Sequence, residues 1–184
     1  MPDTALTLAR TGGKPLQRIV YSEEQIAARV REMGRQIAGD FPDGEDLLVL
    51  GLLKGSFIFL SDLVREITRP LQVDFLVASS YGSGTTTSGE VKLLYNPSAE
   101  IEDKHLIVVE DIVDSGTTLN RLVPMLEKRR PRSLEICALL HKHIAKDLVR
   151  EPRWVGFDAP HEFLIGYGLD HSENFRNLPF IGSL

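Results

Sequence analysis

The chain contains a single cysteine, Cys137, among its 184 residues. One thiol cannot form a disulfide within the chain, and it cannot supply the set of thiolates that a cysteine zinc site needs. No apolar run reaches the roughly 18 residues of a membrane-spanning helix. The first 17 residues lack the apolar stretch that follows a basic start in secretory signals. These absences predict a cytoplasmic protein with no membrane partner.

Basic residues are in the minority, because the formal net charge is −5 at pH 7. A phosphate backbone favours a basic surface, so this balance argues against nucleic acid as a partner. The chain is 42% apolar and 26% charged, as is typical of one globular domain. We expect residues 1–17, which include a Gly-Gly pair and prolines, to form a loose arm. Residues 18–184 are expected to form a single domain.

Apolar runs of strand length alternate with helical patterns along the chain. Ser22 and Gln25 form a capping-box pattern at the start of the first helix. The alternation predicts an α/β fold with a mostly parallel central sheet flanked by helices on both faces. Ligands of such sheets bind beyond the carboxyl ends of the strands. Strands are predicted within 46–53, 73–80, 104–112, 133–140, 154–158 and 163–168, helices within 21–41, 56–67 and 117–129, and a loop at 81–90.

The segment "VVEDIVDSGTT", residues 108–118, joins a buried strand to a cluster of acids and small residues. Its last four residues supply hydroxyls and consecutive backbone N–H groups at a helix start, which favours phosphate binding. An ordinary helix cap is the competing interpretation. The Walker A lysine and the G-x-G-x-x-G pattern are both missing from this segment. The small residues are Ser115, Gly116, Thr117 and Thr118.

Three carboxylates, Glu110, Asp111 and Asp114, stand within five residues of one another in this segment. Acids next to a buried strand are costly unless they bind something. Ionised carboxylates only accept hydrogen bonds and are hard oxygen ligands, so sugar hydroxyls and Mg²⁺ are natural partners. A solvated acidic turn is the alternative.

The segment 108–118 resembles the phosphoribosyl-pyrophosphate motif of type I phosphoribosyltransferases. Four further segments resemble the 6-oxopurine, or hypoxanthine-guanine, branch of that family. The resemblance covers roughly residues 18–184 and implies the type I fold, with a small purine-binding hood made by the N-terminal part and about 152–184. The four segments are "LLKGSFIFLSDLVREI", "VDFLVASSYGSGTTTSGEVK", "ICALLHK" and "VGFDAPHEFLIGYGLDHSENFRNLPFIG".

The resemblance implies a role for each acid. Residues 114–118 would form the loop on the 5′-phosphate. Glu110 and Asp111 would face the ribose hydroxyls and Mg²⁺. Asp114 would be the general base that takes the proton of purine N7. We expect burial beside two other acids to make Asp114 more basic.

The same resemblance assigns the remaining site residues. Lys54, Gly55 and Arg176 would bind pyrophosphate, and a non-proline cis peptide bond is expected between Leu53 and Lys54. Ser80 and Tyr81 would begin a loop that closes over the reaction. The purine would be bound by Lys142 at O6, by the ring of Phe163, by the backbone of Leu164 and by Asp170, which would also contact the metal.

The implied activity is purine salvage. Hypoxanthine or guanine would react with 5-phosphoribosyl 1-pyrophosphate to give IMP or GMP and pyrophosphate, with Mg²⁺ as cofactor. Family members usually form homodimers or homotetramers. Two alternatives stay open: a relative that prefers xanthine, and a regulatory RNA-binding protein with the same fold, which the net charge of −5 disfavours.

Overall fold

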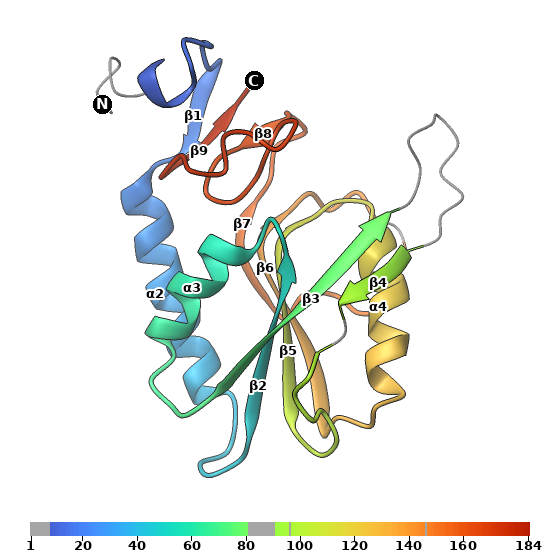
Figure 1. The fold of residues 1–184 in the computed structure, drawn as a ribbon. Helices are drawn as coiled ribbons and strands as arrows, with labels where there is room; N and C mark the ends of the chain where they lie inside the picture. Colours follow the sequence, from blue (N-terminus) through green and yellow to red (C-terminus); the bar gives the residue numbers. More distant parts are fainter. Residues whose placement is uncertain (1–7, 81–90, 96, 146) are drawn as a thin grey trace.

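The computed structural model describes residues 8–80, 91–95, 97–145 and 147–184. A six-stranded sheet has the order β4-β3-β2-β5-β6-β7, and all neighbours are parallel except the edge pair β3 and β4 (Figure 1). A small antiparallel sheet has the order β1-β9-β8. The strands of the large sheet are β2 (Leu47–Leu53), β3 (Gln72–Ser80), β4 (Val91–Tyr95), β5 (His105–Val113), β6 (Ser133–His141) and β7 (Trp154–Asp158). Those of the small sheet are β1 (Arg18–Tyr21), β8 (Leu164–Ile165) and β9 (Ile181–Ser183).

Helices cover both faces of the large sheet, as predicted. α2 (Glu23–Gly39) and α3 (Phe57–Glu66) lie on one face, and α4 (Thr117–Glu127) lies on the other (Figure 1). Ser22 caps α2, and the predicted capping box with Gln25 is present. Over the described part of the chain, no helix has the length and hydrophobicity needed to span a membrane.

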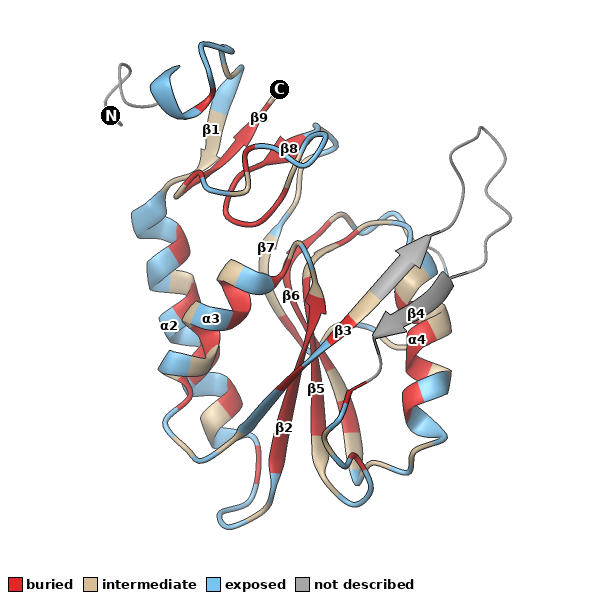
Figure 2. Ribbon diagram, in the orientation of Figure 1, coloured by how far each residue is buried: buried red, intermediate tan, exposed pale blue. Residues whose placement is uncertain are grey.

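The core is divided by the sheet into two layers, because successive strand residues point to opposite faces. On β5, Ile107 and Val109 pack with α2 and α3, whereas Leu106 and Val108 pack with α4. The central strands are buried along most of their length (Figure 2). Continuous apolar runs are expected for parallel strands that are covered on both faces.

The small sheet joins the two ends of the domain. β9 lies between β1 and β8, so the N-terminal strand pairs with the C-terminal one (Figure 1). The strand predicted at 163–168 is limited to Leu164–Ile165. The backbone leaves the extended region after Ile165, because Gly166, Tyr167 and Gly168 all have positive φ. The strands β1, β4 and β9 were not predicted, and the loop predicted at 81–90 lies outside the described residues.

Candidate active site

Predicted site residues follow three neighbouring parallel strands. Lys54 follows β2, Asp114 follows β5 and Lys142 follows β6. β2, β5 and β6 are adjacent in the sheet, so these residues meet at one edge of it. Ser80 ends β3, the strand next to β2, whereas Tyr81 lies outside the described residues. The structure therefore brings the predicted groups from distant segments to the carboxyl end of the sheet.

A cavity of about 210 Å³ opens at the start of α4, lined by Leu52 and residues 110–119. Gly116 is the N-cap of α4 with φ +75°, and Asn120 N–H donates to its carbonyl at 2.9 Å. A Cβ at Gly116 would lie 2.2 Å from Leu148 Cδ2, so both φ and space favour glycine. The N-cap Gly116 makes no side-chain cap, and Ser115 Oγ accepts from the Thr117 N–H at 3.5 Å. The other N–H groups of the first turn of α4 are those that an anion would engage.

Glu110 and Asp111 are the sheltered acids of the site, and Glu110 is only 6% exposed. Burial raises the pKa of Glu110 well above its usual range, and the neighbouring Asp111 charge raises it further. Burial also raises the pKa of Asp111 to about 6, although backbone hydrogen bonds and the Arg176 charge act in the opposite direction. Both carboxyls therefore hold a proton more readily than exposed acids do.

Two glycines allow three segments to stack around Asp111. A Cβ at Gly55 would lie 1.8 Å from Asp111 Oδ2, so only glycine admits the carboxylate there. A Cβ at Gly168, whose φ is +102°, would lie 2.0 Å from the Gly55 carbonyl oxygen. The peptide bond between Leu53 and Lys54 is cis, as predicted. The loop after β2 is thus packed between β5 and the segment that follows β8.

The predicted base and the predicted purine-reading lysine contact each other. Lys142 Nζ lies 3.1 Å from Asp114 Oδ2. The Lys142 side chain is 17% exposed, whereas that of Asp114 is 48% exposed. The expected burial of Asp114 is therefore wrong, because this residue follows the last residue of β5 and lies beyond the sheltered part of the sheet. Its partner is a cation rather than the two neighbouring acids.

Phe163 presents an exposed ring in the segment before β8, with 53% of the residue accessible. Its only ring neighbour among the described residues is His171, edge-on at 5.4 Å between centroids. Leu164, the next residue, is buried in β8. An exposed aromatic face is suited to stacking on a flat ligand.

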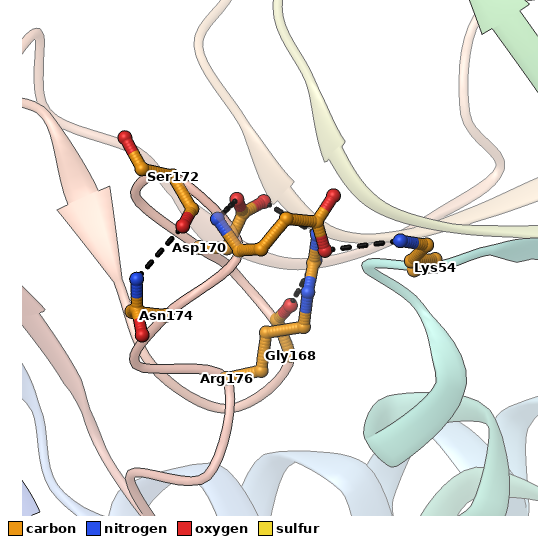
Figure 3. Close-up of polar contacts among 7 residues, drawn as sticks. Lys54, Gly168, Asp170, Ser172, Asn174 and Arg176 are labelled. Atoms are coloured by element: carbon orange, nitrogen blue, oxygen red, sulfur yellow. Dashed lines mark hydrogen bonds and ion pairs between the residues drawn. The ribbon is translucent and has the colours of Figure 1, made fainter.

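Arg176 organises the segment after β8 (Figure 3). Arg176 Nη2 lies 2.8 Å from Asp170 Oδ1, and Arg176 Nη1 donates to the Gly168 carbonyl at 2.8 Å. Glu173 was not predicted as a site residue. Its carboxylate accepts from Lys54 Nζ at 3.0 Å and from Arg176 Nη2 at 3.3 Å. No pattern in the sequence indicates this link, because Lys54 and Glu173 are 119 positions apart.

The acids near this segment bear on metal binding. Within the described residues, no three His, Cys, Asp or Glu side chains gather closely enough to hold a metal by themselves. Mg²⁺ is commonly bound by one or two carboxylates together with substrate phosphates, so a sparse protein donor set fits this ion. Asp170 and Asp111 affect each other electrostatically, and their carboxylate oxygens could hold such an ion.

The family model described as "Phosphoribosyl transferase domain" matches residues 17–172. The chain belongs to this phosphoribosyltransferase family. Hypoxanthine phosphoribosyltransferase of Salmonella typhimurium is 43% identical over 167 residues, which cover 90% of this chain and 94% of that protein. The structure of a hypoxanthine-guanine phosphoribosyltransferase from Bacillus anthracis has a TM-score of 0.86 and 44% identity, covering 92% of this chain and 99% of that one. The fold is thus the type I phosphoribosyltransferase fold.

Another relative is much longer than this phosphoribosyltransferase chain. The bifunctional protein TilS/HprT of Listeria innocua is 41% identical over 169 residues, which are 92% of this chain but only 26% of that protein. The similarity to it is therefore confined to about a quarter of its length.

Proposed function

We propose that the chain transfers the phosphoribosyl group of 5-phosphoribosyl 1-pyrophosphate to hypoxanthine or guanine, in purine salvage. The observation that carries this proposal is the contact between Lys142 Nζ and Asp114 Oδ2 at 3.1 Å. An ammonium group only donates hydrogen bonds and an ionised carboxylate only accepts them. A 6-oxopurine carries the acceptor O6 beside the N7 edge, so the pair complements both groups. A 6-amino group would meet a cation that cannot accept, which disfavours adenine.

In the proposed reaction, purine N9 attacks the anomeric carbon of the ribose, and the bond from that carbon to pyrophosphate breaks. The proton on N7 passes to Asp114 as the new bond forms. The start of α4 holds the 5′-phosphate, and the exposed ring of Phe163 stacks on the base. Such a site works mainly by positioning the reactants and stabilising charge.

Pyrophosphate is proposed to lie between Lys54 and Arg176, the two cations that share the Glu173 carboxylate. Asp170 and Asp111 would hold Mg²⁺ together with the substrate oxygens. When bound, the metal supplies positive charge that neutralises the leaving pyrophosphate. Glu110 and Asp111 would accept from the ribose hydroxyls.

A pyrophosphate-release assay with guanine, hypoxanthine, xanthine, adenine and uracil in parallel tests the function. We expect turnover with hypoxanthine or guanine and little with adenine or uracil. The variant Lys142→Ala should lose most of the purine-dependent rate while pyrophosphate binding is kept. Turnover with xanthine alone would favour the xanthine-preferring alternative. No turnover with any base would favour the RNA-binding alternative.

The assembly is proposed to be a homodimer or homotetramer. Three exposed apolar side chains on α3 and β3, Phe57, Val73 and Phe75, support an interface between copies. Light scattering during size-exclusion chromatography tests this proposal. A monomer at micromolar concentration would contradict it.

A further inference from the structure

A single carboxylate bridges the two cations that are proposed to bind pyrophosphate. Glu173 Oε2 accepts from Lys54 Nζ at 3.0 Å and from Arg176 Nη2 at 3.3 Å. The same oxygen serves both donors. Glu173 therefore occupies the position between Lys54 and Arg176 that a bound anion would take.

The backbone holds Glu173 in this position. Its N–H donates to Asp170 Oδ2 at 2.8 Å, which ties it to the residue that also pairs with Arg176. Ser172 and Glu173 both have positive φ, +53° and +64°, within a tight turn closed by the bridge between His171 and Asn174. The turn directs the carboxylate toward the loop after β2 rather than away from the protein.

We infer that Glu173 is a built-in counter-ion of the pyrophosphate site, which the pyrophosphate group of the substrate displaces when it binds. The inference rests on the proposed function, because it takes Lys54 and Arg176 as the pyrophosphate-binding cations. Glu173 thereby becomes a positioning residue: it holds the two cations before the substrate arrives, and it competes with that substrate for them.

The exposure of the groups makes displacement feasible. The side chains of Lys54 and Glu173 are each 65% exposed, and exposed ion pairs contribute little stability. Pyrophosphate carries several negative charges and can engage both cations at once, so it outcompetes one carboxylate. Competition still weakens anion binding, and it also helps the product pyrophosphate to leave. Glu173 thus lowers the affinity of the site for the phosphoribosyl substrate and for the product pyrophosphate.

The variant Glu173→Gln tests the inference, because it keeps the size of the side chain and removes its charge. Isothermal titration with pyrophosphate should give a Kd roughly two- to tenfold lower than that of the wild type. The KM for 5-phosphoribosyl 1-pyrophosphate should fall by a similar factor, and the KM for the purine should not change. The gain in affinity should shrink at high salt, because screening weakens exposed pairs.

Glu102→Gln is the matched control. Glu102 forms an exposed pair with Arg130 at 2.6 Å, and it precedes β5, at the opposite edge of the sheet from the site. The variant Glu102→Gln removes the same charge as Glu173→Gln but lies away from the site. The Kd of pyrophosphate should therefore not change. In a Lys54→Ala background, Glu173→Gln should improve pyrophosphate binding less than it does in the wild type.

An unchanged or weaker pyrophosphate affinity in Glu173→Gln would overturn the inference, provided that the wild type binds pyrophosphate and turns over purine. An equal gain in Glu102→Gln would also overturn it, since the effect would then come from net charge alone. A wild type that binds neither pyrophosphate nor the phosphoribosyl substrate would instead refute the proposed function, and the inference with it.

Discussion

Replacing Asp111 by asparagine is predicted to stabilise the ligand-free protein and to impair the enzyme. Asp111 lies on β5, with its carboxylate against Gly55 in the loop after β2. Burial raises its pKa from 3.8 to about 6. At neutral pH Asp111 is still mostly ionised, and this ionised form costs more free energy in the folded state than in the unfolded state. Asparagine has nearly the same shape, so it fits against Gly55 without the charge.

The magnitude follows from the pKa. Each pKa unit corresponds to about 1.36 kcal/mol, so a rise from 3.8 to about 6 corresponds to at most about 3 kcal/mol at pH 7. Part of the side chain still reaches solvent, so we expect a gain of about 1 to 3 kcal/mol. For a chain of this length, that gain raises Tm by roughly 2 to 12 °C.

The pH dependence has a definite sign. Because the folded pKa of Asp111 is raised, its protonated form stabilises the fold at low pH, and this contribution is lost as pH rises from 3.8 through about 6. The advantage of Asp111→Asn should therefore be absent near pH 4, grow up to about pH 6 and stay constant above it. Denaturant unfolding of both ligand-free proteins in EDTA, across this pH range, measures the difference in their free energies of unfolding.

The activity of Asp111→Asn should fall although its stability rises. Losing a charged acceptor at the ribose and metal positions should lower kcat/KM by roughly 10- to 100-fold. Asp111→Asn being less stable than the wild type at pH 7, or equally more stable at pH 4 and pH 7, would refute the electrostatic reasoning. Glu102→Gln serves again as a control for the removal of one exposed charge.

Two further predictions concern other titratable groups of the site region. Asp114→Asn should lower kcat by roughly 10²- to 10⁴-fold with little change in the Kd of the phosphoribosyl substrate, and full activity would remove Asp114 as the base. His141 is buried, and burial together with the neighbouring His143 lowers its pKa. Its neutral form therefore stabilises the fold above about pH 6.5, and this contribution is lost as pH falls. The free energy of unfolding should then fall less between pH 7 and pH 5 in His141→Asn than in the wild type, and equal slopes in urea titrations would contradict this.

The parallel strands of the large sheet could be predicted from apolar runs bounded by turns, whereas its antiparallel edge strand β4 was not predicted. β2, β5 and β6 were placed within one or two residues of their observed ends. The small sheet could not be predicted in full, because strands of two to four residues, such as β1, β8 and β9, are too short to show a period. Their pairing joins residues at opposite ends of the chain, which no local pattern encodes.

The roles expected at strand ends followed from the resemblance to the family, but the contacts among these residues did not. Lys142 and Asp114 were assigned to the same base separately, and only the structure pairs them at 3.1 Å. Glu173 was not predicted as a site residue, because its role depends on the contact with Lys54, which lies in the loop after β2. Pairings of this kind are set by how loops pack over the sheet edge, not by spacing along the chain.

The three crowded acids of residues 110–114 are separated by burial and by their partners. Glu110 and Asp111 lie within β5 and line one cavity, and Asp114 lies beyond the strand, where Lys142 balances it. Among the described residues, Asp114 is the one of the three that pairs with a cation, so the charge cost of the site falls on Glu110 and Asp111. A ligand that brings Mg²⁺ and hydroxyl donors would remove this cost. Glu110 and Asp111 therefore make the ligand-free fold less stable, and in the proposed site the same electrostatic cost would favour substrate binding.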